Sequence, residues 1–135
     1  MMWVQPKTNW TAGDRFNISD YNRIKVNLNF LHKRAEQFYF GFDIIDMGTD
    51  KGYSDYPYAR EINNIEKNLE TINRNVFTQD IGDTTTFYSN GSFIKWDELN
   101  RIESATLSIY EMLNRQEAGM APLSFRLGNM KGVKT

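Results

Sequence analysis

The sequence predicts a mainly α-helical single domain in which three helices pack as a bundle, and three observations support this prediction. A motif of an acid, an apolar residue, Asn, Arg or Asn, and Ile occurs three times in the chain of 135 residues. Each copy is followed by apolar residues at steps of three and four, the spacing of an amphipathic helix. A chain of this length can bury one core of ordinary size, and three apolar faces cover one another in a bundle. The helices are predicted over about residues 19–39, 58–76 and 97–116.

The apolar stripe of each predicted helix can be written down from the motif onward. A core built from these positions is expected to lie between the helices. The stripes are Tyr21, Ile24, Leu28, Leu31, Ala35 and Phe38 in the first helix, Ile62, Ile65, Leu69, Ile72 and Val76 in the second, and Leu99, Ile102, Thr106, Ile109 and Leu113 in the third.

Capping residues are predicted at the start of the first helix. Ser19 precedes the motif and is a good N-cap, and Asp20 suits the positive end of the helix dipole. With Ser19 as the cap, Asn22 falls at the third helical position, where its amide can bond back to the incoming backbone as in a capping box. Gly41 is expected to mark the end of this helix.

The other two helices begin with related signals. Asp97 is the predicted N-cap of the third helix, which places Asn100 at the position equivalent to Asn22. The second helix has no matching cap, so its start is expected near Pro57, and Asn63 is the equivalent asparagine. The three asparagines are therefore expected to have a structural capping role rather than to bind a ligand.

The segments outside the helices are expected to be aromatic loops, a short strand and a tail. Aromatic, turn-rich loops precede the helices at residues 10–18, 53–58 and 87–96 and are expected to pack over the ends or seams of the bundle. Gly119 and Pro122 are expected to end the third helix. Residues 123–127 alternate apolar and polar side chains as a half-buried strand does.

The sequence does not decide which segment pairs with the predicted strand. The strand can pair within the chain against residues 84–88, which have β propensity, or it can add to a neighbouring chain. Residues 130–135 are expected to form a mobile tail.

Composition excludes several classes of protein. The 16 basic and 17 acidic residues give a net charge of -1 and are interleaved, so no basic stripe for nucleic acid is expected. Absence of cysteine excludes disulfides and thiolate chemistry. No stretch resembles a signal peptide or a membrane span, so we expect a protein made in the cytoplasm that does not enter a membrane.

No catalytic, metal or cofactor site is predicted. The single histidine, His32, lies beside the predicted core stripe and is interpreted as a boundary residue rather than a ligand. Two carboxylate pairs, 43/46 and 80/83, lie in turn-rich loops, where Asp commonly bonds to the backbone. The chain is therefore expected not to be an enzyme.

Four stretches resemble a family of small proteins of tailed phages and prophages of Gram-positive bacteria, encoded among tail and baseplate genes. These stretches are residues 10–24 (WTAGDRFNISDYNRI), 46–59 (DMGTDKGYSDYPYA), 87–103 (FYSNGSFIKWDELNRIE) and 123–128 (LSFRLG). The resemblance implies a non-enzymatic structural protein of the virion, in the tail, tail tip or baseplate. It implies other phage structural proteins as partners and no catalytic motif.

The expected mode of action is assembly by protein–protein contact, with homo-oligomers expected. Candidate interface residues are apolar or aromatic and lie in the predicted loops, the strand and the first residues: Trp3, Trp10, Tyr53, Tyr56, Tyr58, Leu123, Phe125 and Leu127. Two alternatives stay open. The tyrosine-rich loop could stack on sugar rings of a host receptor, or the protein could be an assembly helper that is absent from the finished particle.

Overall fold

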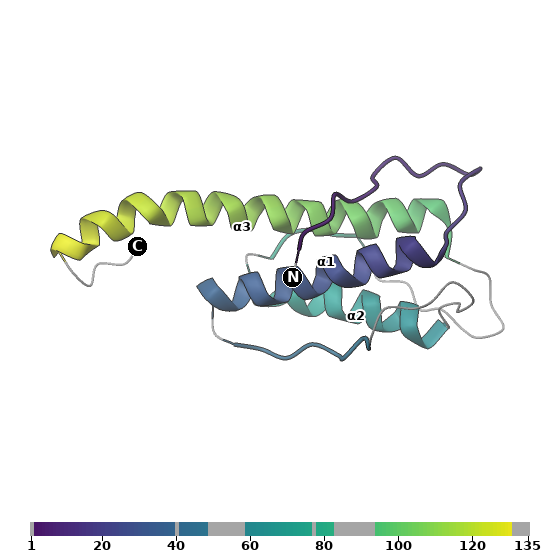
Figure 1. Ribbon diagram of the computed structural model, residues 1–135, viewed down its shortest axis with the longest axis horizontal. Coiled ribbons are helices and arrows are strands. Elements are labelled where there is room, and N and C mark those ends of the chain that lie inside the picture. The colour runs from purple at the N-terminus through teal and green to yellow at the C-terminus, as the bar shows by residue number, and fades with distance from the viewer. Residues whose placement is uncertain (1, 40, 49–58, 77, 83–93, 131–135) are drawn as a thin grey trace.

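The described residues of the computed structural model form three helices, and two of these match their predicted bounds within one residue at each end. Its elements are α1 (Ile18–Phe38), α2 (Ala59–Asn75) and α3 (Trp96–Met130) (Figure 1). The structure describes residues 2–39, 41–48, 59–76, 78–82 and 94–130, with side chains for all of these except 59 and 119–130.

The predicted C-terminal strand is wrong, because α3 continues as a helix through residues 123–127 to Met130. The alternating pattern misled because Leu123 and Leu127 are also four residues apart, so five residues fit a helix as well as a strand. A helix that has already formed grows without a second nucleation step. Here it runs through Gly119 and Pro122, which were expected to end it.

The core is the one that the sequence predicts. All stripe positions from the motif onward are buried in the structure except Phe38, which is half-buried against the core. Leu28, Leu31 and Leu69 have no exposed surface. Full burial of a side chain of this size contributes about 1.5–3 kcal/mol to stability, so the three stripes hold the helices together.

All three helices run in the same direction (Figure 1). For α1 and α3, the side-chain contacts Arg23–Glu103 and Arg34–Asn114 both join residues that are 80 apart, as parallel helices require. Parallel neighbours cannot be joined by a tight turn. α1 has 21 residues and is about 32 Å long at 1.5 Å per residue, so the chain must return over that length before the next helix starts.

The N-cap of α1 is Asn17 rather than Ser19. The Asn17 side chain accepts a hydrogen bond from the backbone N–H of Asp20, and the Asp20 carboxylate accepts one from the backbone N–H of Asn17, which completes a capping box. Ser19 is the second helical residue and its hydroxyl donates to Asn17 Oδ1 at 2.6 Å. The capping box fixes the start of the helix, and Asp20, not Asn22, occupies its third position.

The predicted capping role of Asp97 is also wrong, and the motif asparagines do not lie at the predicted third helical position. α3 starts one residue before Asp97, with the N–H of Leu99 bonded to the carbonyl of Lys95, and Asp97 accepts from Glu98 N–H inside the first turn. The motif asparagines Asn22, Asn63 and Asn100 each lie at the fifth residue of their helix, a turn beyond the cap. Among the residues described, no helix is long and apolar enough to cross a membrane.

Candidate functional site

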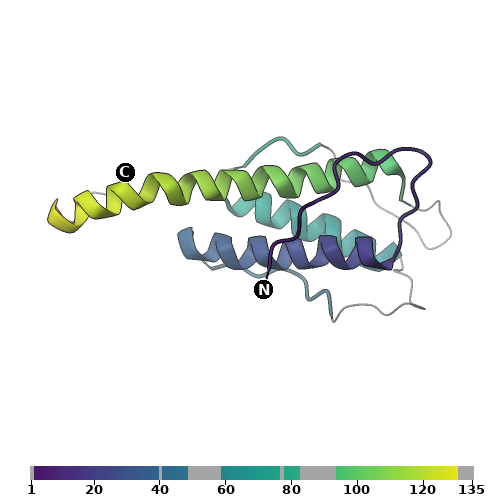
Figure 2. The same ribbon diagram turned by 45° about the horizontal axis from the view of Figure 1, so that its top comes forward.

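Residues 2–10, here called the strap, form an extended segment that lies across α1 and α3 (Figure 2). The strap runs opposite to the helices, because its early residue Val4 contacts Asn27 of α1 while its last residue, Trp10, contacts Asn100 near the start of α3. The strap forms neither helix nor strand. The backbone groups of Val4, Lys7 and Trp10 are instead paired with side chains of the bundle.

Two asparagine side chains each hold one strap residue by both of its backbone groups. Asn27 accepts from the N–H of Val4 at 2.9 Å and donates to its carbonyl at 2.7 Å. Asn100 accepts from the N–H of Trp10 at 2.8 Å and donates to its carbonyl at 2.9 Å. A carboxamide thus acts as a short piece of neighbouring strand, satisfying a donor and an acceptor together. We call this arrangement an asparagine clamp.

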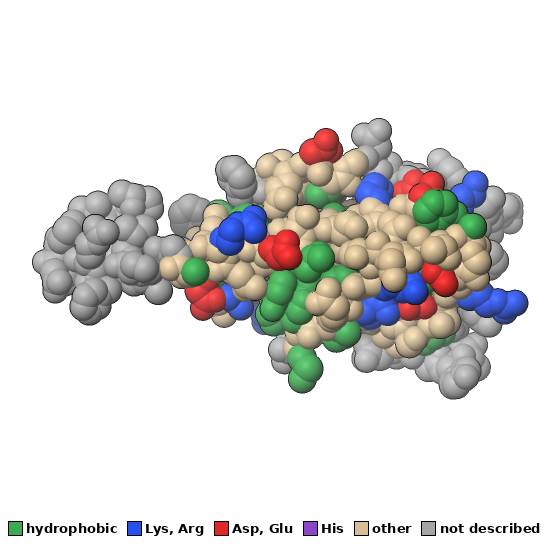
Figure 3. Space-filling view, turned by 90° about the horizontal axis from the view of Figure 1, so that it is seen from above, with side chains coloured by type: hydrophobic (Ala, Val, Ile, Leu, Met, Phe, Trp, Pro, Cys, Tyr) green, Lys and Arg blue, Asp and Glu red, His purple; other side chains and the backbone are tan. Residues whose placement is uncertain are grey.

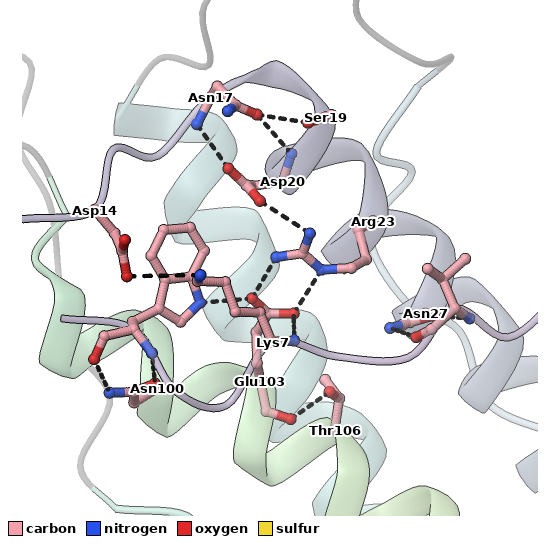
Figure 4. A network of polar contacts seen from close by, with 12 residues as sticks. Lys7, Asp14, Asn17, Ser19, Asp20, Arg23, Asn27, Asn100, Glu103 and Thr106 are labelled. Atoms are coloured by element: carbon pink, nitrogen blue, oxygen red, sulfur yellow. Dashed lines mark hydrogen bonds and ion pairs between the residues drawn. The ribbon is translucent and has the colours of Figure 1, made fainter.

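Glu103 of α3 is the centre of the site and is fully buried (Figure 4). Its carboxylate accepts from the backbone N–H of Lys7 at 3.1 Å and from the indole N–H of Trp10 at 2.8 Å. It also accepts two hydrogen bonds from the Arg23 guanidinium of α1, at 2.8 and 2.6 Å. One buried carboxylate therefore joins the strap, α1 and α3.

The charge of Glu103 is balanced by Arg23. Burial lowers the pKa of the Arg23 guanidinium, but its hydrogen bonds and ion pairs with Glu103 and Asp20 outweigh this, so the pKa lies above its ordinary value. Arg23 also pairs with Asp20 at 2.9 Å, which links the capping box of α1 to the strap site. A buried carboxylate is stable only with such charged and hydrogen-bonding partners.

The first strap residues carry an aromatic cluster at the edge of the site. The Trp3 ring stacks on Tyr110 of α3 with centroids 4.0 Å apart and an interplanar angle of 1°, and it meets Phe30 of α1 at 5.8 Å. The indole N–H of Trp3 is buried and has no hydrogen-bond partner among the residues that the structure describes. Met2 and Val4 are 74% and 39% exposed, so this end of the strap adds apolar surface to the molecule.

Residues 11–16, here called the hinge, connect the strap to α1, and residues 11–15 are exposed. The hinge contains a turn in which Asp14 N–H bonds to the Thr11 carbonyl and Thr11 N–H bonds to the Asp14 carboxylate. The backbone hydrogen bond from Thr11 lowers the pKa of Asp14. Lys7 of the strap pairs with Asp14 at 3.6 Å, with both side chains one-third exposed.

A second extended segment repeats the clamp on α2. Ile45 is held by Asn68, which accepts from its N–H at 2.7 Å and donates to its carbonyl at 2.9 Å. The separation of 23 residues between Ile45 and Asn68 is the same as that between Val4 and Asn27. Buried Lys25 of α1 donates to the carbonyl of Gly48 at 3.2 Å, so this segment too is tied to the neighbouring helix. The chain therefore contains a repeated unit of an extended segment followed by a helix.

A similar buried pair joins α2 and α3. Arg101 of α3 binds the buried carboxylate of Glu66 and pairs with Glu98 at 2.9 Å. Burial lowers the Arg101 pKa, but the bonds with Glu66 and Glu98 raise it above its ordinary value. Arg101 occupies the same position in the third motif copy as Arg23 in the first. The ion pairs Arg101–Glu66 and Arg23–Glu103 therefore join equivalent positions of the repeat.

The structure brings few of the predicted interface residues together. Trp10 is buried at 3% exposure within the core of its own chain, so it is not an exposed surface residue of the single chain. Trp3 lies in the aromatic cluster at the surface. The predicted residues Tyr53, Tyr56 and Tyr58 and the segment 84–88 lie outside the described residues, as do the side chains of Leu123, Phe125 and Leu127.

Five residues of the clamps and buried ion pairs were missed because polar side chains on amphipathic helices usually face solvent. A signal was nevertheless present. The residue directly after the motif Ile is charged in every copy. In the first two copies, the third residue after the motif Ile is Asn. The missed residues are Lys25, Asn27, Glu66, Asn68 and Glu103, all buried.

The residues considered for chemistry have structural contacts. Asp46 and Asp80 accept from the N–H groups of Gly48 and Gly82, both with positive φ, which confirms turn-forming roles for these two. His32 bonds through Nε2 to the carbonyl of Phe42. Within the part of the chain that the structure describes, no three His, Cys, Asp or Glu side chains gather as a metal site would require.

The surface seen from above mixes charges of both signs with apolar side chains (Figure 3). Acidic and basic groups are interspersed on this face rather than gathered into one stripe. Comparison with protein-family models, curated protein sequences and solved structures gives no match.

Proposed function

We propose that the chain is a non-enzymatic structural protein of a tailed-phage particle, in the tail, tail tip or baseplate, which acts through contacts with other structural proteins. The resemblance of its sequence to small phage tail and baseplate proteins suggests this role. The observation that supports it best is the projection of α3 beyond the bundle (Figure 1).

The projecting part of α3 begins where α1 ends. Among the residues whose side chains the structure describes, the contacts of α3 nearest to its projecting part are those of Tyr39 with Gln116 at 2.8 Å and of Arg34 with Glu117. From residue 118 to Met130 the helix passes beyond the end of α1 (Figure 1). This arm contains Leu123, Phe125 and Leu127, which we propose as contact residues for a neighbouring protein in the particle.

The particle itself provides the test. Purified virions should contain the chain in a constant ratio to known tail proteins when they are analysed by quantitative mass spectrometry. Absence from purified virions, with the chain present in the infected-cell lysate, would contradict the proposal and favour an assembly helper.

A pair of truncations would test the arm. Stopping the chain after residue 118 removes the arm, and stopping it after residue 130 removes only the last five residues as a matched control. We expect the first truncation, but not the second, to prevent incorporation into particles. Circular dichroism should show that the bundle of both truncated chains is still helical. Equal incorporation of both would contradict the role of the arm.

A further inference from the structure

We infer that the strap is an exchangeable arm, and that its binding site on α1 and α3, here called the groove, also accepts the strap of a second copy of this chain. The inference rests on the proposed function for its biological purpose, because exchanged straps would join copies in a particle. Its physical basis is separate and lies in how the strap is held.

The bonds that hold the strap do not depend on its being part of the same chain. The clamps recognise Val4 and Trp10 through backbone atoms, and Glu103 recognises the N–H of Lys7 and the indole of Trp10. The same set of hydrogen bonds forms whether the strap arrives from its own chain or from another. Exchange of an identical segment therefore changes little in contact energy.

The hinge is the part that must change. Residues 11–15 are exposed, and the turn at Thr11 and Asp14 is made of local hydrogen bonds. Water can replace the hydrogen bonds of this exposed turn when the hinge opens. The core residues that are uncovered when the strap leaves are covered again by the strap of a partner. Within one chain the strap has the advantage of a high effective concentration, so exchange is favoured where copies are crowded together.

The groove selects this strap among extended peptides. It buries Trp10 to 3% exposure with Glu103 placed to accept the indole N–H at 2.8 Å, and it stacks Trp3 on Tyr110. A ligand therefore needs two tryptophans at a fixed spacing on an extended backbone. A second copy of the strap meets this requirement.

Photo-crosslinking in the full chain tests the exchange. A photoreactive benzoyl-phenylalanine replaces Trp3, and equal amounts of unlabelled and ¹⁵N-labelled protein are incubated at high concentration and irradiated. The products are digested and the crosslinks to Phe30 or Tyr110 are sorted by isotope. Because the two labels are present in equal amounts, crosslinks between copies should join unlike labels as often as like labels. Crosslinks that all join residues of one label within a monomer would overturn the inference.

Random collision is controlled by the same photoreactive residue in place of Trp96, which is 44% exposed and lies outside the strap. It should give no mixed-label crosslink to Phe30 or Tyr110. Circular dichroism checks that each variant is helical.

A complementation experiment decides the matter if the photoreactive variant does not fold. One full-length variant keeps its strap but has a disabled groove, Asn27→Leu with Asn100→Leu. The other keeps its groove but has a weakened strap, Trp3→Ala with Trp10→Ala. Native mass spectrometry should show a one-to-one complex in the mixture and monomers in each variant alone; only monomers in the mixture of two helical variants would overturn exchange.

The outcomes separate this inference from the proposed function. Detection in virions without mixed-label crosslinks would leave the structural role and remove strap exchange. Mixed-label crosslinks with no chain in virions would leave exchange and remove the phage role.

Discussion

Glu103 shows how one residue can hold segments that are far apart in the chain. Its carboxylate is fully buried and binds Lys7 and Trp10 from the strap together with Arg23 from α1. A guanidinium and two N–H donors take the place of the water that the carboxylate has lost. The residue is therefore needed for the docking of the strap as well as for helix packing.

The substitution Glu103→Ala is expected to lower the free energy of unfolding by about 3–5 kcal/mol, because it removes one of the two buried carboxylates that pair with Arg23 and leaves the N–H groups of Lys7 and Trp10 without their acceptor. Urea unfolding followed by circular dichroism measures the change. The matched control is Glu111→Ala at an exposed position of α3, for which a change within about 0.5 kcal/mol is expected. Equal effects of the two substitutions would contradict the role of Glu103.

The stability of the protein is expected to depend on pH in the alkaline range because of Tyr21. Burial and then the charge of Glu61 raise the pKa of its phenol from 10.0 to about 12. Between these pH values the unfolded chain loses the phenolic proton while the folded chain keeps it, so the free energy of unfolding falls as pH rises. In Tyr21→Phe this part of the fall is absent. Unfolding curves at several pH values from 9 to 12 compare the slopes, and identical slopes would be evidence against the shift.

At the scale of elements, the chain contains a unit larger than a helix. Val4 with Asn27 and Ile45 with Asn68 show that an extended segment and the helix that follows it are clamped in the same register twice. The clamp places the extended segment against its helix without a sheet. The repeat thus includes the connections, which sequence periodicity had assigned to loops.

Equivalent clamps should have equivalent energies. Asn27→Ala and Asn68→Ala each leave a donor and an acceptor of the held residue without their partner, which costs about 1–3 kcal/mol per buried group. We expect the two losses of stability, measured by urea unfolding, to agree within about 1 kcal/mol. A large loss for one and none for the other would show that the two clamps are not equivalent.

Much of the bundle could be predicted from the sequence, because amphipathic stripes report burial directly. The stripe from Tyr21 to Ala35 is buried as predicted, and the bounds of α1 and α2 agree within one residue. The end of α3 could not be predicted, since Leu123 to Leu127 fit two periodicities.

The candidate site was largely out of reach of sequence analysis. The bond between Trp10 and Asn100 joins residues 90 apart, and an extended segment has no periodicity that names its partner. A buried Glu103 also looks like a solvent-facing residue until the strap covers it.

At the scale of the whole molecule, the parallel bundle and the projecting helix are separable. The described contacts that tie α3 to α1 extend to Gln116 and Glu117, and Leu113 is the last buried residue of α3 among the side chains that the structure describes. The bundle should therefore be able to fold without the arm.

Truncation after residue 118 is expected to change the free energy of unfolding by less than about 1 kcal/mol, because surface changes away from the core usually have small effects. Thermal and urea unfolding of the truncated and complete chains measure the difference. A large loss of stability would show that the arm folds back on the bundle.

The order in which a ribosome releases the chain gives the strap an unusual history. Two of the residues that bind the strap, Asn100 and Glu103, are made 90 and 93 residues after Trp10. At about 5–20 residues per second, the nascent strap waits several seconds before its groove exists. During that delay the strap is free to meet the grooves of other copies, so exchange of straps can begin while the chain is still being made.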